Sequence, residues 1–349
     1  MRRRTFISAA LGGLGGLLAG GAGWYATRAQ SGTITRSSVP VAGNQKLYTG
    51  ADLAFGTTMA IHVLHHDAIK AELAIEDAFH QARNIDRLMS IYSEASQVFQ
   101  LNRDGGFNRP DPHLLTVLKE TQRLSVLSGG AFDITVQPLW LAFTQAAAMQ
   151  SLPSEQERLR AQSRVNWADL VVSEQQLYFK KPGMSITLNG IAQGYAVDLA
   201  LAAVQSHGIT HALLDTGEFI STGKKTANQA WTVGVQDPRN LAELTTALHM
   251  DGRSVATSGD YETTFTPDFV HNHIFDPVTG DSPPELASVT VAAPTGLLAD
   301  GLSTALFVMG HQKAMQLVAR LDHVDVLLVD KKGRITASPG MRKIATTLA

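Results

Sequence analysis

Three runs within residues 254–310 carry most of the chemistry of this chain: SVATSGDYETTF (254–265), FVHNHIFDPVTG (269–280) and ADGLSTALFVMG (299–310). They contain a serine–glycine turn, two histidines, an aspartate before proline, and an aspartate and a threonine four residues apart. Polar groups this dense in an apolar frame indicate a binding or catalytic site. The other segments of the chain have to hold that site in place.

The last of these runs is predicted to be a helix that holds a candidate metal site. Its apolar residues recur at helical spacing; they are Leu297, Leu298, Leu302, Ala305, Leu306 and Val308. Asp300 and Thr304 therefore share a face. Two oxygen ligands one turn apart suit Mg²⁺, which takes few protein ligands and leaves positions open for phosphate. Two structural explanations stay open: an aspartate in a first turn favours the helix dipole, and a mid-helix threonine can bond to the carbonyl one turn back.

The run VHNHIFDP (270–277) is predicted to be a strand with His271 and His273 on one face. Two imidazoles and Asp276 could bind zinc. Asp276 before Pro277 is also typical of an ordinary turn. We favour a third interpretation, in which one histidine acts as a general base beside a metal-bound phosphate.

Composition excludes several classes of function. The chain has 349 residues, 44% of them hydrophobic, which is enough for a substantial core in one large or two medium domains. Its formal net charge is −2 and it shows no basic stripe, which argues against a nucleic-acid partner. It contains no cysteine, so a disulfide framework, a thiolate metal site and a lipid-bearing cysteine are impossible.

Residues 1–30 are predicted to be a twin-arginine signal peptide. Arg2, Arg3 and Arg4 precede a weakly apolar, glycine-rich run that is typical of export in the folded state. An uncleaved membrane anchor, or a glycine helix-packing motif, is the competing interpretation. Export predicts a periplasmic protein. Residues 31–45 are rich in Ser, Thr, Gly and Pro and are predicted to be a linker.

The rest of the pattern predicts alternating helices and strands. In the first half these are a hairpin over 46–64 that turns at Gly56, a helix from Asp67 to Met89, and a helix from Asp111 to the glycines 129 and 130 that leads into a strand. Later come a short helix within 150–165, strands at 169–173, 176–180 and 185–188, a helix from Gly190 to Gly208, and a closing hairpin of 324–329 and 333–337. The glycine turn before the helix at Gly190 is a ready site for an anion.

The three opening runs resemble the C-terminal motifs of the ApbE family, flavin transferases that move FMN from FAD onto a protein threonine. IDRLMSIYSEASQVFQLNR (85–103), SGGAFDITVQPLW (128–140) and ITLNGIAQGYAVDLALAAV (186–204) resemble further motifs in the family's order, so the resemblance spans about 46–337. It implies an α+β, ApbE-like fold with a mixed, largely antiparallel sheet and long helices. A single compact catalytic body over 46–340 is expected.

The resemblance also implies ligands and site residues. FAD as substrate and Mg²⁺ are expected, with the metal held by Asp300, Thr304 and the Gly190 carbonyl, and with His273 and Asp300 as the catalytic residues. The residues expected to contact FAD are Phe55, Gly56, Thr57, Tyr92, Ala131, Phe132, Asp133, Thr187, Gln193, Ser258, Gly259, Tyr261, His273 and Ile274. His271 is expected to be structural.

This chain departs from the family's pattern at several of these positions. Phe55 replaces a methionine, Thr187 an aspartate, Asn189 a glycine, Gln193 a lysine and Thr216 a glycine. Two rival functions stay open. One is an FAD pyrophosphatase that releases FMN and AMP with water as the nucleophile, and the other, suggested by Thr187 and Gln193, is a non-catalytic flavin-binding assembly partner. The expected partner is an acceptor protein with a target threonine, a membrane-associated electron-transfer flavoprotein. The signal peptide resembles that of the NosX-like branch, whose acceptor is the nitrous oxide reductase regulator.

Overall fold

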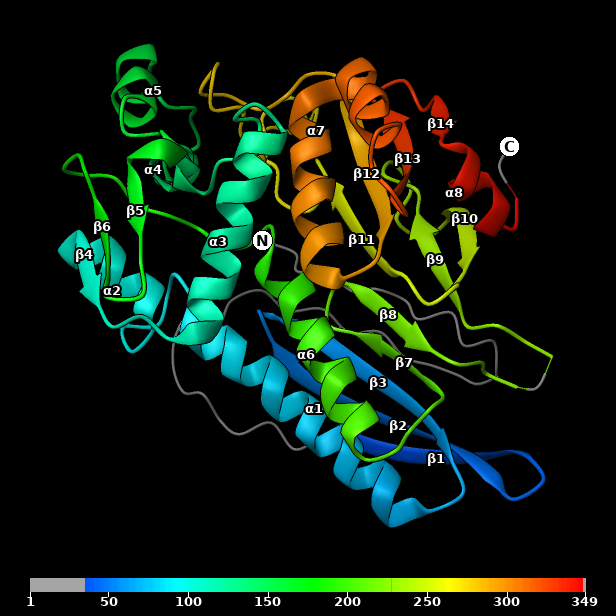
Figure 1. Ribbon diagram of the computed structural model, residues 1–349. Helices are drawn as coiled ribbons and strands as arrows, with labels where there is room; N and C mark the ends of the chain where they lie inside the picture. The colour runs from blue at the N-terminus through cyan, green and yellow to red at the C-terminus, as the bar shows by residue number, and fades with distance from the viewer. Residues whose placement is uncertain (1–34, 227, 348–349) are drawn as a thin grey trace.

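A nine-stranded sheet runs through the molecule in the order β1-β2-β3-β7-β8-β11-β12-β13-β14 (Figure 1). Each strand of this sheet pairs antiparallel with its neighbours. The strands are β1 Thr35–Ala42, β2 Gln45–Ala54, β3 Thr57–His65, β7 Ala212–Asp215, β8 Phe219–Thr222, β11 Ser254–Gly259, β12 Leu286–Ala293, β13 Asp325–Asp330 and β14 Ile335–Ala337. The computed structural model describes residues 35–226 and 228–347, so the predicted signal peptide lies outside the described residues.

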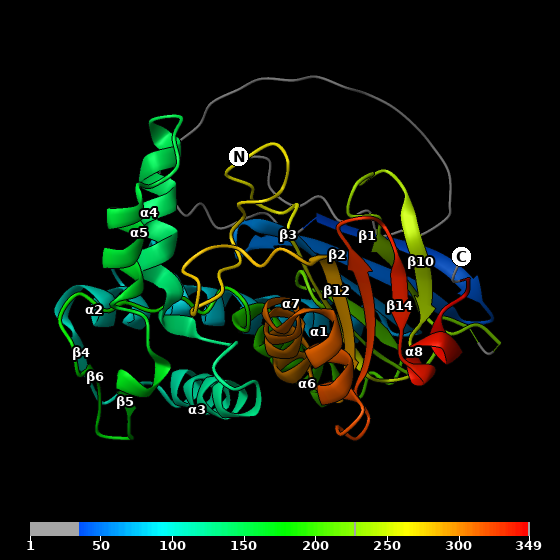
Figure 2. The same ribbon diagram turned by 90° about the horizontal axis from the view of Figure 1, so that it is seen from above.

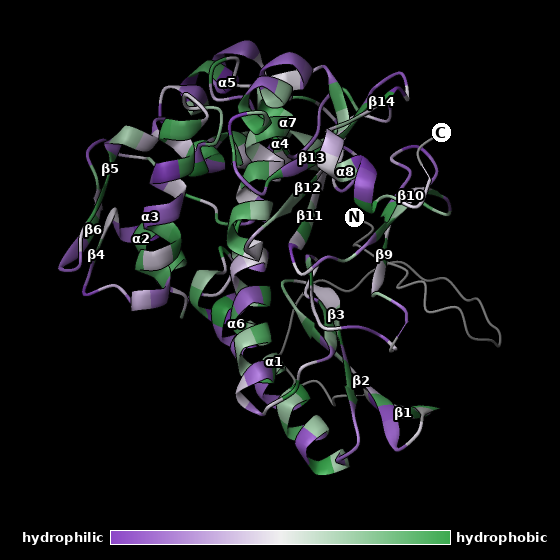
Figure 3. Ribbon diagram, turned by 45° about the vertical axis from the view of Figure 1, so that its right-hand side comes forward, coloured by the Kyte–Doolittle hydropathy of each residue, from purple (hydrophilic) through white to green (hydrophobic). Residues whose placement is uncertain are grey.

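Three long helices cover one face of this sheet: α1 Ala68–Met89, α6 Ala192–Ser206 and α7 Gly296–Val318 (Figure 2). The first was predicted with its boundaries, because the Asp67 carboxylate caps it by accepting from Ile69 N and Lys70 N. Its apolar stripe is buried and joins the main core together with α6 and α7. Figure 3 shows the hydrophobic residues on these helices. The helical geometry of α7 is interrupted at Gly310, where φ is 76°.

The opposite face of β8, β11, β12 and β13 is covered by a smaller unit. It consists of β9 Thr232–Gln236, β10 Leu244–His249 and α8 Pro339–Ile344. A second core lies there, with Trp231, Val255 and Leu327 among its members. Because the sheet is covered on both faces at this point, every residue of β12 is buried.

The expected linker is wrong for residues 35–42, which form strand β1. This strand pairs antiparallel with β2, with Val39 opposite Leu47. Residues 36–40 are exposed, so the strand has the polar composition of a linker although its backbone is bonded on one side. An edge strand tolerates such residues, including Pro40, because only one of its sides is paired.

A second lobe packs beside the helices and holds two further corrections. It comprises α2 Gln97–Asp104, β4 Gly106–Asn108, α3 Pro112–Leu127, η1 Ile134–Val136, α4 Gln137–Ala148, α5 Glu155–Gln162, η2 Trp167–Asp169, β5 Leu170–Val172 and β6 Gln176–Phe179. The strand expected after Gly130 is a 3₁₀ turn running into α4, because Asp133 caps it and Pro138 suits a first helical turn. The strand expected at 185–188 is irregular. Both backbone groups of Ile186 bond to the Asn102 side chain instead of a neighbouring strand.

Candidate active site

The candidate metal ligands come together where α6 and α7 meet. Thr295 caps α7, and Asp300 and Thr304 follow on one face of that helix. A Cβ placed on Gly190 would lie 2.8 Å from Thr304 Oγ1, so the turn before α6 touches the threonine. Thr304 Oγ1 is also 3.1 Å from Ser258 Oγ on β11. The structure therefore brings Gly190, Ser258, Asp300 and Thr304 into one place, and their binding of a metal stays a prediction.

Asp300 is held in position by the first turn of α6. Its side chain is buried, and its Oδ2 accepts a hydrogen bond from Gly194 N at 2.9 Å. The two helices can approach this closely because glycines face each other. A Cβ on Gly194 would lie 2.1 Å from the Gly296 carbonyl oxygen, and one on Gly296 would lie 2.3 Å from that of Gly194.

Asp198 is a positioning residue that sequence reasoning missed. Its carboxylate accepts from Gly296 N at 2.6 Å and Leu297 N at 2.9 Å, so α6 caps the start of α7 from outside. Burial raises the pKa of Asp198 to about 6, although the two backbone hydrogen bonds lower it. No local signal could have revealed this contact, because the residues lie 98 positions apart.

The ligand chemistry fits magnesium better than zinc. Among the described residues no group of three or more His, Cys, Asp or Glu side chains could hold a metal ion. The zinc interpretation is therefore wrong for His271, His273 and Asp276. A buried carboxylate, a hydroxyl and a peptide carbonyl are hard oxygen donors, and so few protein ligands leave positions open for phosphate.

The histidine run is a loop instead of the predicted strand. Isolated bridges join Thr264 to Asn272 and Asp276 to Asp281. His271 turns its Nδ1 toward Asp281, at 2.7 Å, in agreement with the expected structural role. His273 is half-buried, and its backbone N–H donates to the Thr263 carbonyl at 3.0 Å. Asp276 forms the alternative that the sequence left open, a turn in which its Oδ1 accepts from Val278 N.

Two of the predicted flavin-contacting runs lie side by side. Thr187 N donates to the Ile134 carbonyl, which places the 186–190 run against the residues that follow Asp133. The Asp133 carboxylate accepts from Thr135 N, Thr135 Oγ1 and Trp167 N. Burial raises the pKa of Asp133, and these hydrogen bonds lower it. In this structure Asp133 holds its own loop, and its contact with FAD stays a prediction.

The other residues predicted to contact FAD differ in exposure and in local structure. Phe55 and Gly56 form a tight β2–β3 turn with φ of 52° and 71°. Tyr92 is 72% exposed. Gly259 is required by its neighbour, since a Cβ there would lie 2.2 Å from the Tyr261 ring. Thr57, Phe132 and Ile274 are buried, and Ala131 is half-buried.

Gln193, at the position where the resemblance expects a lysine, makes two neutral hydrogen bonds with Thr216. Its Nε2 donates to the Thr216 carbonyl at 2.9 Å, and Thr216 Oγ1 donates to the Gln193 carbonyl at 3.1 Å. Two of the departures from the family's pattern therefore contact each other. They join the start of α6 to the turn between β7 and β8.

An open cavity of about 320 Å³ lies between α2, the start of α4 and residues 183–185, which precede the 186–190 run. Its lining includes Ile91 and Asn102 from the run that carries Tyr92. The sequence predicts no role for Asn102. In the structure it both lines this cavity and holds Ile186.

Residues 55–328 match the sequence model of the ApbE family. The chain belongs to the ApbE family. A relative from Klebsiella pneumoniae (strain 342), named FAD:protein FMN transferase, is 30% identical over 292 residues that cover 80% of this chain and 83% of that protein. One of the same name from Treponema pallidum (strain Nichols) is 29% identical over 322 residues, which cover 84% and 87%.

Solved structures of ApbE proteins share the fold. The ApbE protein of Thermotoga maritima superposes with a TM-score of 0.78 and 28% identity, covering 86% of this chain and all of that one. The apo form of the Pseudomonas stutzeri flavinyl transferase ApbE gives a TM-score of 0.74 and 25% identity over 87% of this chain and 98% of the other. The predicted ApbE-like α+β fold, with its large antiparallel sheet, is confirmed.

Proposed function

We propose that this ApbE-family chain is a Mg²⁺-dependent FAD:protein FMN transferase that moves FMN from FAD to a threonine hydroxyl of an acceptor protein and releases AMP. The observation that carries the proposal is the meeting of Gly190, Asp300 and Thr304. The names of the Klebsiella and Treponema relatives support the transferase activity.

The proposed reaction is a substitution at one phosphorus atom of FAD. The threonine oxygen attacks the phosphorus on the FMN side, a new phosphoester bond forms, and the bond to the AMP oxygen breaks. AMP leaves with that bonding electron pair. The imidazole of His273 accepts the proton from the threonine hydroxyl.

The chain's own residues hold the reacting groups in this proposal. Asp300, Thr304 and the Gly190 carbonyl would hold Mg²⁺, which when bound supplies Lewis-acid neutralisation of phosphate charge. Gly194 N fixes one oxygen of Asp300, and Ser258 Oγ lies beside the hydroxyl of Thr304. Both ligand side chains are thus oriented before any ligand arrives, which lowers the cost of ordering them.

The acceptor and the location of the reaction are further parts of the proposal. The predicted twin-arginine signal supports export to the periplasm, where a membrane-associated electron-transfer flavoprotein would receive the FMN. By the resemblance to the NosX-like branch, that acceptor is the nitrous oxide reductase regulator. Among the described residues no helix is long and apolar enough to cross a membrane.

The test combines purified protein, FAD, Mg²⁺ and a periplasmic acceptor protein. Flavin fluorescence on the acceptor in a denaturing gel, with the mass of one FMN added at a threonine, is the expected result. Asp300→Ala should abolish the signal, while Asp322→Ala, which removes an exposed aspartate, should leave it unchanged. AMP release without acceptor would favour the pyrophosphatase, and FAD binding without turnover at any Mg²⁺ concentration would favour the carrier.

A further inference from the structure

The loop of residues 260–285 joins β11 to β12 and carries both histidines. It lies beside the helical pair α4 and α5, as Figures 1 and 2 agree. Phe143 of α4 packs against Phe265 and Phe275 at ring-centroid distances of 5.3 and 5.0 Å. This aromatic contact attaches the loop to the second lobe, and polar contacts from α5 complete the attachment.

His271 is held on two sides. Its Nδ1 is 2.7 Å from Asp281 Oδ1, and its ring centroid lies 6.1 Å from that of Phe143. Asn272, which lies between the two histidines, is hydrogen-bonded to Ser282, the residue that follows Asp281. Asn272 N donates to Ser282 Oγ and Ser282 Oγ donates to the Asn272 carbonyl, both at 2.8 Å. The backbone from His271 to His273 therefore cannot shift without moving residues 281 and 282.

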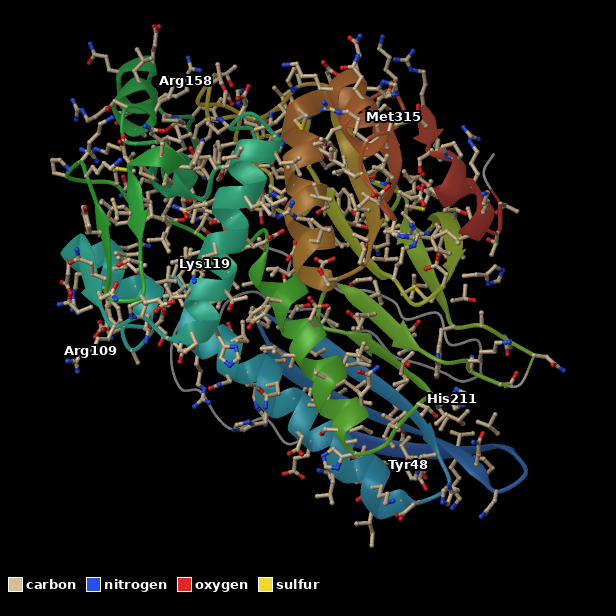
Figure 4. The ribbon with its side chains drawn as sticks, viewed as in Figure 1. Tyr48, Arg109, Lys119, Arg158, His211 and Met315 are labelled. Carbon is tan, nitrogen blue, oxygen red and sulfur yellow. The ribbon has the colours of Figure 1, made fainter. Side chains whose placement is uncertain are left out.

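Helix α5 fixes the far side of that segment. Arg158 donates to the Thr279 carbonyl at 3.1 Å and lies 3.8 Å from Asp281 Oδ2. Gln162 donates to the Val278 carbonyl at 2.5 Å. Arg158 and Gln162 are one turn apart, so they reach the loop from one face of the helix. Figure 4 labels Arg158 on α5.

We propose that Asp281 is a positioning residue for His273, acting through His271 and held in place by Arg158. The inference rests on the proposed function, in which His273 takes the threonine proton. A general base works only within hydrogen-bond reach of that proton, and a displacement of about 1 Å can cost roughly a hundredfold in rate. The peripheral helix α5 thereby serves catalysis from outside the site.

The experiment compares Asp281→Ala, Asp281→Asn and Arg158→Gln with Arg160→Gln, which removes an exposed arginine from the same helix. For each variant of the mature protein, kcat and the KM for FAD are measured with the acceptor. Asp281→Ala should lower kcat about 10-fold and leave the KM within about twofold, because the base moves while the FAD contacts stay. Asp281→Asn should restore most of the rate, since its amide oxygen still accepts from His271. Arg158→Gln should fall between them, and Arg160→Gln should match the wild type.

Hydrogen exchange of residues 262–283, measured without acceptor, gives a readout besides activity. Faster exchange in Asp281→Ala, confined to this loop, is expected. The proposal is overturned if that variant keeps a wild-type kcat, if only its KM rises, or if exchange is unchanged or rises throughout the protein. A wild-type protein that transfers no FMN would sink the proposed function alone, because the exchange comparison still decides whether Asp281 holds the loop.

Discussion

Gln193 and Thr216 bind each other through two reciprocal side-chain-to-backbone hydrogen bonds of 2.9 and 3.1 Å. Both residues are buried, with Thr216 fully shielded from solvent. The resemblance to the family leads us to expect a lysine and a glycine at these positions, and the residues found here bond to each other. Because neither side chain is charged, the contact avoids the desolvation of an ion. The contact joins the start of α6 to the turn between β7 and β8 without an ion pair.

Removing either member should weaken the fold non-additively. Gln193→Ala takes a donor from the buried Thr216 carbonyl and should destabilise the protein by about 1–3 kcal/mol. Thr216→Val removes only the hydroxyl and should cost about 1 kcal/mol. In urea unfolding, the double variant should lose less than the sum of the two, because both bonds belong to one contact. Strict additivity would show that the two bonds act independently.

Gly194 should tolerate no side chain. Gly194→Ala would place its Cβ 2.1 Å from the Gly296 carbonyl oxygen and 2.6 Å from Asp300 Cβ. Such overpacking costs about 1–3 kcal/mol or more and would push α6 and α7 apart at the proposed metal ligands. We expect a lower Tm and a higher Mg²⁺ requirement for transfer. Gly106→Ala is the matched control, since the nearest atom to its Cβ is 3.5 Å away, and equal effects in both variants would contradict this account.

Asp198 should make stability depend on pH between 4 and 6. Burial raises its folded pKa from 3.8 to about 6, so the folded state holds this proton more tightly than the unfolded chain does. The stabilisation is full below pH 3.8 and is lost as the pH rises through 6. From pH 7.5 to 5, the wild type should gain about 1 kcal/mol relative to Asp198→Asn. Urea unfolding of both proteins at the two pH values measures the difference.

The comparison must be made between variants because His62 acts in the opposite direction. Burial and the charge of Lys225 lower the pKa of His62 from 6.5 to about 4. The imidazole of His62 is therefore protonated at a higher pH in the unfolded chain than in the folded protein, and stability is lost as the pH falls below 6.5. The loss is common to the wild type and Asp198→Asn and cancels in their difference. A difference that is flat with pH would show that Asp198 titrates normally in the fold.

Thr304 should be required for its hydroxyl and not for its shape. Thr304→Val keeps the branched side chain but removes the proposed ligand oxygen and the contact with Ser258. Loss of an outer-shell partner already weakens a metal site about 10- to 100-fold, so the Mg²⁺ concentration for half-maximal transfer should rise by at least about 10-fold. Thr304→Ser should stay close to the wild type. Equal Mg²⁺ curves for the valine and serine variants would exclude the hydroxyl as a ligand.

Local signals predicted the elements that local forces determine. Asp67 caps α1 at its predicted start, and the predicted closing hairpin appears as β13 and β14. Asp300 and Thr304 could be assigned to one helical face because four residues make about one turn. Strand β1 was missed because an edge strand that buries little has the composition of a linker.

The sequence predictions were wrong where contacts between distant residues determine the local backbone structure. Alternation in VHNHIFDP indicated a strand, but the run forms only an isolated bridge between Asn272 and Thr264, and the His271 side chain pairs with the Asp281 carboxylate. The extended stretch around Ile186 bonds to Asn102, 84 residues earlier. Contacts between residues that distant leave no periodic trace in the sequence, so only the folded chain reveals them.

The bond from Gly194 N to Asp300 spans 106 residues, which has a consequence for the order of synthesis. A ribosome that has finished α6 has made Gly194, while Asp300 on α7 is still untranslated. If Asp300 and Thr304 hold the metal as proposed, a nascent chain arrested before α7 would lack this site, however well its earlier segments had folded. The nascent chain should therefore gain the proposed site late in synthesis, when α7 packs against α6.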